Sequence, residues 1–504
     1  MHDAPHRWRL GATARRWGGN HTSRYNWELG NAWNTGKDWF FENVDYEGKS
    51  GPSYQRFIDD DVAHGLATAL TVPTIGWVAK DTKSHGFPVS VFGPQRATAP
   101  ENKDAGDGED VNGHPVVPGS PDRTSVPMPP AGIGRWVRAV RERDAKRPSG
   151  GVAMYILDNE PTLWSSTHRD VHPEPVSYDE LFENTVAYAT EIRRVAPEAV
   201  IAGPALWGWS AMFFSGVDQA ARPRQPDRDR HGGTPLLPWW LRNVAAREKQ
   251  TGIRLVDLVD VHFYPQGKGM GVGTEGATDV ETRARRIRST RALWDPAYVD
   301  ESWIADSVRL IPRLKQWIQS EHPGLGISIG EYNFGAEGDV SGGLAVAEAL
   351  GRFGTEAITA AFYWDYPPDG SPAFWAFRTF RDFDGHGGRF LDRSVPAFSS
   401  DGRASVFASR DESGTHVVAV LLDLDPGAPI EVSVDASSCG RQLEARAFEY
   451  AGGAAGLVSS NIEARERSER LLTTLPPYSI TVLDLHFDVP HAPSEQRIDE
   501  PHGK

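Results

Sequence analysis

The chain has 504 residues, of which 39% are hydrophobic and 24% are charged, and its formal net charge is −15. This length predicts one large domain and one smaller domain, and the acidic balance argues against nucleic acid or an anionic membrane as a partner. No transmembrane helix is predicted, because no run of 18 apolar residues occurs. The 17 tryptophans suit stacking on sugar rings, although they also fill large cores.

Short apolar runs alternate with amphipathic segments between about residues 14 and 366. Helices are predicted at residues 178–195, 302–320 and 344–353, and strands at 14–18, 69–76, 153–157, 200–203, 258–262, 327–330 and 359–364. This alternation is typical of a (β/α) barrel or a doubly wound sheet. Because no dinucleotide-binding glycine motif follows a strand, we predict a TIM-like (β/α)8 barrel over residues 1–392.

A long insertion at about residues 92–133 interrupts the barrel pattern and is rich in proline, glycine and aspartate. Loops of this length are usually functional or disordered. Its carboxylates include Asp104, Asp107 and Asp110, which are hard oxygen ligands beside glycines and are therefore candidates for a structural calcium site. A solvated acidic loop remains the alternative.

After the barrel the apolar period changes to two, which predicts a β-sandwich over residues 393–488. The expected strands span residues 405–409, 416–424, 430–434, 443–450 and 479–484. Residues 489–504 are polar and are expected to be disordered.

Two of the predicted barrel strands end at a glutamate, Glu160 and Glu331. Catalytic groups of parallel barrels lie at the carboxyl ends of the strands, and two facing carboxylates suffice to cleave a glycosidic bond. Glu160 is the candidate general acid, which needs a raised pKa, and Asn159 could donate to a neighbouring sugar hydroxyl. Glu331 is the candidate nucleophile, which must stay ionised.

Further candidates also lie at strand ends. His262 and Tyr264 end one strand and could donate hydrogen bonds to Glu331, and Trp364 ends another and could serve as a platform for a sugar ring. A structural role for His262 and a core position for Trp364 remain the alternatives.

Several sequence blocks carry a resemblance to a known family. The first is Arg-Trp-Gly-Gly-Asn-His-Thr-Ser-Arg-Tyr-Asn-Trp-Glu at residues 16–28, followed by Asn-Thr-Gly-Lys-Asp-Trp-Phe at 34–40. The others are Leu-Asp-Asn-Glu-Pro-Thr-Leu-Trp at 157–164, His-Phe-Tyr-Pro at 262–265, Leu-Trp-Asp-Pro at 293–296 and Glu-Tyr-Asn-Phe-Gly at 331–335. In this order the blocks resemble glycoside hydrolase family 44 over about residues 10–485.

The resemblance implies a retaining endo-β-1,4-glucanase or xyloglucanase, with a TIM-like barrel joined to a β-sandwich. It implies a β-glucan partner, no cofactor for the chemistry and, in many members, a bound calcium. The resemblance does not identify the calcium ligands in this chain. A monomer is expected. By resemblance Glu160 is the acid/base and Glu331 the nucleophile. The other site residues implied are Arg16 and Asn159 at the reacting subsite, Tyr264 near the nucleophile, and Trp39 and Trp364 under sugar rings.

The strand count departs from the family pattern. The resemblance places the acid on the fourth strand and the nucleophile on the seventh, so the strand of Arg16 is the second, and only seven strands are visible. The first eight residues also lack the apolar core of a signal peptide. We therefore expect that this chain starts late, without the first strand and an export signal, in which case the family resemblance implies secretion. The single cysteine, Cys439, cannot form an intrachain disulfide.

Two alternatives remain open. The same fold could hydrolyse mannan or another hemicellulose, since no residue identifies the outer sugars. An incomplete barrel could also misplace the carboxylates and leave an inactive glycan-binding protein. A metal hydrolase and a serine hydrolase are disfavoured, because neither HExxH nor a GxSxG after a strand occurs.

Overall fold

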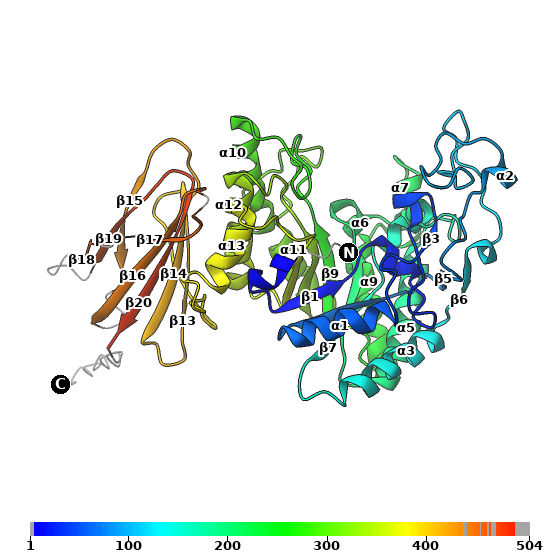
Figure 1. The fold of residues 1–504 in the computed structure, drawn as a ribbon, viewed down its shortest axis with the longest axis horizontal. Coiled ribbons are helices and arrows are strands. Elements are labelled where there is room, and N and C mark those ends of the chain that lie inside the picture. Colours follow the sequence, from blue (N-terminus) through cyan, green and yellow to red (C-terminus); the bar gives the residue numbers. More distant parts are fainter. Residues whose placement is uncertain are drawn as a thin grey trace, which may run out of the picture.

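Seven parallel strands form the central sheet of the computed structural model, in the order β1-β4-β7-β8-β9-β10-β11 (Figure 1). The strands are β1 (Ala14–Trp17), β4 (Ala67–Val72), β7 (Gly151–Leu157), β8 (Val200–Leu206), β9 (Leu258–Phe263), β10 (Gly326–Tyr332) and β11 (Ala360–Tyr363). Each corresponds to a strand that the sequence predicts. The structure describes residues 5–436, 439, 441–453, 455–460, 463–464 and 470–488, so the expected disorder at 489–504 lies outside the described residues.

The sheet curves into a barrel that is nearly closed. Its two edge strands, β1 and β11, do not pair with one another among the described residues, so closure is incomplete. A cavity of about 1330 Å³, part of it open to solvent, lies between them and is lined by Ala14 on one edge and Phe362 on the other. Residues ahead of β1 form the 3-10 helix η1 (Pro5–Leu10). The described residues thus contain seven barrel strands, as the sequence predicts.

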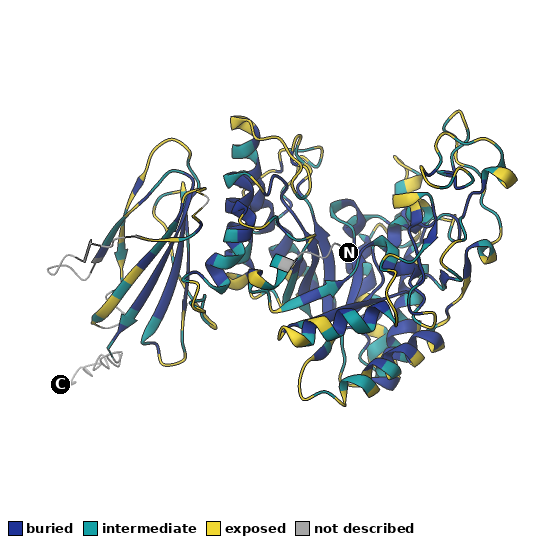
Figure 2. Cartoon of the chain, in the orientation of Figure 1, coloured by how far each residue is buried: buried dark blue, intermediate teal, exposed yellow. Residues whose placement is uncertain are grey.

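Helices cover the outer face of the sheet, which is typical of a parallel sheet buried on both sides (Figure 2). They are α1 (Ser53–Ala63), α3 (Pro130–Asp144), α5 (Tyr178–Val195), α9 (Leu236–Thr251), α10 (Val280–Ser289), α11 (Leu310–Glu321), α12 (Val340–Thr355) and α13 (Pro372–Arg381). Shorter helices are α4 (Trp164–Thr167), α6 (Trp209–Phe213), α7 (Gly216–Ala220), α8 (Pro226–Arg230) and the 3-10 helices η2 (Asn20–Arg24), η3 (Gly36–Trp39), η5 (Pro161–Leu163) and η6 (Thr290–Leu293). No described helix is both long and apolar enough to cross a membrane.

Local capping explains where two predicted helices begin. Helix α5 starts as predicted because the Ser177 side chain accepts a hydrogen bond from the Glu180 backbone N–H at 3.1 Å. Helix α11 starts at Leu310, eight residues later than the predicted 302, and that part of the prediction is wrong. The Asp300 carboxylate accepts from the Ser302 N–H at 3.0 Å, and Arg309 has a φ of 34°. Both features hold the chain in turns ahead of the helix.

The insertion at residues 92–133 consists mostly of loop and lies at the end of the barrel farthest from the sandwich (Figure 1). Its regular elements are the end of α2 (Val89–Phe92), η4 (Pro121–Arg123), β6 (Ser125–Pro127) and the beginning of α3. Strand β6 pairs with β5 (Trp77–Ala79), and β2 (Trp33–Asn34) pairs with β3 (Asn43–Val44). The insertion is therefore anchored to the barrel at its C-terminal end.

The C-terminal region contains two antiparallel sheets, as predicted. The larger one comprises β12 (Arg393–Val395), β13 (Ala404–Arg410), β14 (His416–Asp423), β20 (Ser479–Phe487), β16 (Gln442–Tyr450) and β17 (Val458–Ser460). The smaller one comprises β15 (Ile430–Asp435), β19 (Arg470–Leu475) and β18 (Glu463–Ala464). Along β14, Val417 and Ala419 pack in the sandwich core, whereas Val418 and Val420 belong to the core shared with the barrel.

Candidate active site

Glu160 follows β7 after Asp158 and Asn159, in a backbone conformation that turns it out of the strand. Asp158 and Glu160 have φ angles of 64° and 49°, which are uncommon for residues with side chains and cluster at functional sites. The Glu160 N–H donates to the Ala205 carbonyl of β8 at 3.1 Å, and Pro161 begins η5. The β7 end is therefore held against its neighbouring strand with the Glu160 side chain partly exposed.

Asp158 holds this turn, and the sequence reasoning did not identify it. Its fully buried carboxylate accepts hydrogen bonds from the backbone N–H groups of Thr74, Ile75 and Asn159. It also accepts from the Ser23, Thr74 and Trp164 side chains. Since this network joins three separate segments behind Glu160, Asp158 positions the acid. Its place two residues before a strand-end glutamate was the available signal.

Glu331 lies on β10 with a buried carboxylate. Arg16 Nη1 donates to Glu331 Oε1 at 2.7 Å, and the Tyr264 hydroxyl donates to Oε2 at 2.8 Å. A register shift between β10 and β9 brings Glu331 opposite His262. The predicted donors His262 and Tyr264 are thus brought to the predicted nucleophile.

His262 lies between the two carboxylates. Its Nδ1 atom is 2.8 Å from Glu160 Oε1 and 3.4 Å from Glu331 Oε2. One carboxylate oxygen of each glutamate and a ring nitrogen of His262 lie within 4.8 Å of one another. The two carboxylates therefore face one another across a short gap.

The electrostatic surroundings give the two charged partners opposite protonation behaviour. Burial opposes ionisation of Glu331, but the positive charges of His262 and Arg16 and the hydrogen bond from Tyr264 outweigh it and hold the pKa of Glu331 below its usual range. Burial likewise disfavours protonation of His262, but the two carboxylates outweigh it and raise the pKa of the imidazole. Burial beside Glu331 raises the pKa of Tyr264 well above its ordinary value, so Tyr264 remains a donor. Glu331 is thereby kept ionised.

Arg16 connects the nucleophile to the acid's strand. Its Nη2 atom donates to Asn159 Oδ1 at 2.7 Å, and Asn159 Nδ2 donates to Asn20 Oδ1 at 3.1 Å. The predicted subsite residues Arg16 and Asn159 are therefore in direct contact, and both are almost completely buried. Their side chains cannot turn away without breaking this chain of contacts.

The two predicted sugar platforms are placed differently. Trp364 follows β11, is 37% exposed and lines the same cavity as Arg16 and Glu331. Gly19 has a φ of 93°, and a Cβ there would lie 3.0 Å from the Trp364 ring, so this approach requires glycine. Trp39 is exposed and donates from Nε1 to Glu101 at 2.6 Å. It does not line this cavity, and its role as a platform stays a prediction.

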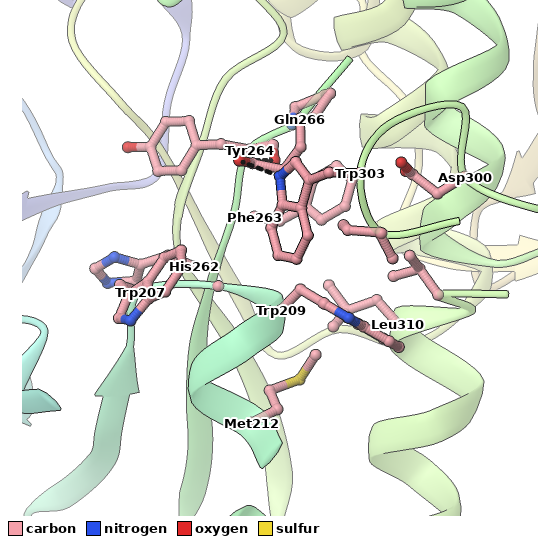
Figure 3. Close-up of a pocket in the computed structure, with 14 residues that line it drawn as sticks. Trp207, Trp209, Met212, His262, Phe263, Tyr264, Gln266, Asp300, Trp303 and Leu310 are labelled. Atoms are coloured by element: carbon pink, nitrogen blue, oxygen red, sulfur yellow. Dashed lines mark hydrogen bonds between the residues drawn. The ribbon is translucent and has the colours of Figure 1, made fainter. Parts of the chain in front are cut away.

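A second cleft, of about 460 Å³ and partly open to solvent, begins at His262 and Tyr264 (Figure 3). Its lining includes three tryptophans that the sequence reasoning did not single out: Trp207, Trp209 and Trp303. Trp303 is 55% exposed, and its indole N–H points to Gln266 at 3.4 Å. Trp207 and Trp209 directly follow β8, so the strand-end rule that identified Trp364 could also have found them.

The structure does not assemble a calcium site from Asp104, Asp107 and Asp110. Asp104 accepts from the Ser90 N–H, Asp107 from the Glu109 N–H and Asp110 from the Asn112 N–H. These are separate turns, and among the described residues the three carboxylates do not converge into a group that could share one ion. The arrangement gives no support to these three ligands, and both the ligands and the structural calcium stay predictions.

Two groups of three metal-binding side chains do converge within the described residues. One is Glu160, His262 and Glu331, and the other is on the sandwich. In the first group the Arg16 guanidinium is only 2.7 Å from Glu331. Because the Tyr264 hydroxyl also donates to the second oxygen of Glu331 at 2.8 Å, both oxygens of this carboxylate already accept a hydrogen bond, so this trio suits proton transfer better than metal binding.

Comparison with known proteins points to carbohydrate-active enzymes. The model of glycoside hydrolase family 44 matches residues 32–267. Endoglucanase A of Paenibacillus lautus is 29% identical over 501 residues, which is 94% of this chain and 68% of that protein.

Solved structures agree over nearly the whole chain. CelM2, a bifunctional glucanase-xylanase from a metagenome library, is 35% identical with a TM-score of 0.89, covering 95% of this chain and 93% of CelM2. A family 44 xyloglucanase of Paenibacillus polymyxa, solved with xyloglucan, is 27% identical with a TM-score of 0.79, covering 95% and 94%.

Proposed function

The chain belongs to glycoside hydrolase family 44 and is a glycoside hydrolase of the endoglucanase/xyloglucanase type, and we propose that it cleaves β-1,4-glucan chains internally with retention of configuration. The observation that carries this proposal is the contact of His262 with both Glu160 and Glu331. Retaining glycosidases have carboxyl groups about 5–5.5 Å apart, whereas inverting enzymes leave roughly 6.5–9.5 Å for a water molecule. Facing oxygens within 4.8 Å support the first class.

In the first step, Glu331 attacks the anomeric carbon as the glycosidic bond breaks. Glu160 gives its proton to the departing oxygen, and a covalent glycosyl–enzyme ester forms. Arg16 and Tyr264 both contact the Glu331 carboxylate. They hold it in position for attack and keep it ionised until the bond to carbon forms.

In the second step, Glu160 is a carboxylate and acts as the base. It removes a proton from water, the water oxygen bonds to the anomeric carbon, and the ester to Glu331 breaks. Two inversions restore the starting configuration. His262 contacts both carboxylates and can follow the negative charge as it passes from Glu331 to Glu160.

The substrate chain is proposed to extend from the cavity of Trp364, past the two glutamates, into the second cleft. Trp364 shares a cavity with the nucleophile, which suits the sugar that becomes attached to Glu331. The cleft of Trp207, Trp209 and Trp303 begins at His262 and Tyr264, which suits the departing part of the chain. Aromatic faces and neutral polar groups fit an uncharged polysaccharide, and the related xyloglucanase was solved with xyloglucan.

The decisive experiment measures stereochemistry. Proton NMR of the first products from a soluble β-glucan should show the β-anomer before mutarotation. Glu331→Ala should abolish hydrolysis, and azide should restore turnover and yield an α-glycosyl azide. An initial α-product from the native enzyme would disprove retention. Glu281→Ala, on an exposed helix surface, is the control that should leave hydrolysis unchanged.

A hemicellulose is the second candidate substrate, because the similar protein CelM2 is a glucanase-xylanase. Initial rates on cellulose-type glucan, xyloglucan, xylan and mannan would rank the substrates. Absence of turnover on all four, with binding preserved, would instead indicate a glycan-binding protein. We further propose that the enzyme is a monomer, since one chain supplies every side chain of the site, and that it is secreted, since its polymeric substrate is too large to enter a cell.

A further inference from the structure

A second group of metal-binding side chains lies on the β-sandwich. His416 on β14 stands directly opposite His486 on β20, and Asp484 lies two residues before His486 on the same face of its strand. One donor atom from each of these three residues lies within 4.8 Å of the other two. Within the described part of the chain, the catalytic trio is the other such group.

Both imidazoles face one oxygen of Asp484. His416 Nε2 lies 2.6 Å from Asp484 Oδ1, and His486 Nε2 lies 3.9 Å from the same atom. The rings stack with their centroids 4.2 Å apart and 14° between their planes. Only His416 is close enough for a hydrogen bond, so the orientation of His486 is not explained by one.

Arg446 on β16 fixes the carboxylate. Asp484 is 1% exposed, and its Oδ2 accepts two hydrogen bonds from Arg446, the one from Nε at 3.0 Å. This paired contact satisfies Oδ2 and leaves Oδ1 directed at the two imidazoles. Carboxylates that bind metals are commonly held by outer hydrogen bonds of this kind.

We propose that His416, Asp484 and His486 bind a transition-metal dication of the zinc type, with solvent at the remaining positions. Imidazole nitrogen together with one carboxylate oxygen is a ligand set for zinc and its neighbours, whereas calcium takes oxygen ligands. Tetrahedral ligands at about 2.1 Å from zinc lie roughly 3.4 Å apart. Binding therefore moves His416 away from Asp484 and brings His486 closer.

The surroundings permit this rearrangement. The His416 and His486 side chains are 27% and 39% exposed, so both rings can turn and an ion can enter from solvent. The ion would join β14 to β20, two neighbouring strands of the larger sheet. Arg446 also lies 3.8 Å from Asp384, which follows barrel helix α13. A bound ion would therefore stabilise the sandwich where it meets the barrel.

The test is calorimetric titration of the full chain, freed of metal with a chelator, with zinc chloride at neutral pH. One tight equivalent is expected, and His416→Ala and His486→Ala should each weaken it at least about 10-fold. His114→Ala is the matched control, because His114 pairs with Asp110 but is 77% exposed and belongs to no group of three possible metal ligands in the described part of the chain. Glu331→Gln changes the catalytic trio and not the proposed site, so this variant should still bind one equivalent of zinc.

Two further measurements exclude a folding artefact. Zinc should raise the Tm of the native chain but not that of His486→Ala, whose Tm without metal should match the native value. Cobalt(II) should give visible absorption that disappears in both histidine variants. A native chain that binds no zinc, or histidine variants that bind it as tightly as the native chain, would overturn the proposal. Hydrolysis is not used as a readout, so failure of the proposed function would not affect this test.

Discussion

Arg16 and Glu331 are 315 residues apart in the chain, yet Arg16 Nη1 donates to Glu331 Oε1 at 2.7 Å and to the Gly330 carbonyl at 2.9 Å. The arginine comes from edge strand β1 and the glutamate from β10, which pairs with β11, the strand at the other edge. The contact therefore crosses the barrel interior, and it ties the nucleophile to an edge of the sheet.

Arg16→Met should lower kcat/KM by about 100-fold or more, because Glu331 loses a charged donor and Asn159 loses its partner. Arg16→Lys should recover only part of this loss, since lysine keeps the charge but cannot reach both partners with a planar fork. Steady-state kinetics on a soluble glucan would measure both effects. Arg9→Met, which removes an exposed pair with Asp369, is the control; an equal loss in that variant would contradict the role of Arg16.

His262→Asn should move the acidic limb of the kcat/KM profile to higher pH. In the native enzyme His262 is a leading cause of the lowered pKa of Glu331, so activity should persist until the pH falls through that lowered value. Without the imidazolium, Glu331 takes up its proton at a higher pH. His114→Asn serves as the control, and an unchanged acidic limb in His262→Asn would refute the assignment.

The contact between His262 and Glu331 should also make the free energy of unfolding depend on pH in a defined direction. The pKa of His262 is higher in the folded chain than in the unfolded chain, so protonated His262 stabilises the fold. This stabilisation is complete below about pH 6.5 and is lost as the pH rises through the raised pKa. The pKa of Glu331 is lower in the folded chain, so ionised Glu331 stabilises the fold at the other end of the pH range. This stabilisation is complete above about pH 4.3 and is lost as the pH falls through the lowered pKa. Denaturant unfolding of native chain and His262→Asn should therefore differ most between these limits; equal curves would argue against the coupling.

Asp158→Ala should destabilise the protein by about 3 kcal/mol, because it leaves several buried donors without an acceptor. Activity per folded molecule should also fall, since Glu160 loses the support behind its turn. Thermal unfolding and active-site titration would separate the two effects. Asp279→Ala, at the exposed N-cap of α10, removes similar contacts near solvent and should cost clearly less.

Trp303→Ala should raise KM for a long glucan several-fold while leaving the rate on a short aryl glycoside nearly unchanged. Trp303 lines the cleft beyond Tyr264 and is half exposed, so it can stack only on sugars that extend past the reacting bond. Trp364→Ala, beside the nucleophile, should impair both substrates. Phe398→Ala, an exposed aromatic on the sandwich side, is the control for loss of any surface ring.

Most barrel strands could be predicted because each is a local apolar run that ends at a polar residue. All seven appear within a few residues of the predicted bounds. The sandwich strands β12, β17, β18 and β19 were not predicted. Strands β12, β17 and β18 have only 3, 3 and 2 residues, and the six residues of β19 do not alternate strictly between apolar and polar. Pairing makes them strands: β12 with β13, β17 with β16, β19 with β15, and β18 with β19.

The sequence by itself determined the two glutamates and their strands, because hydrophobic period and strand-end position are local properties. Only the tertiary structure decided that His262 contacts both glutamates, that Asp158 supports the acid from behind, and that Arg16 reaches Glu331. It also decided that Asp104, Asp107 and Asp110 do not converge. Each of these outcomes depends on distances between residues that are far apart in the sequence. Those distances are set by strand register, backbone turns and the closure of the barrel, and no local sequence pattern encodes them.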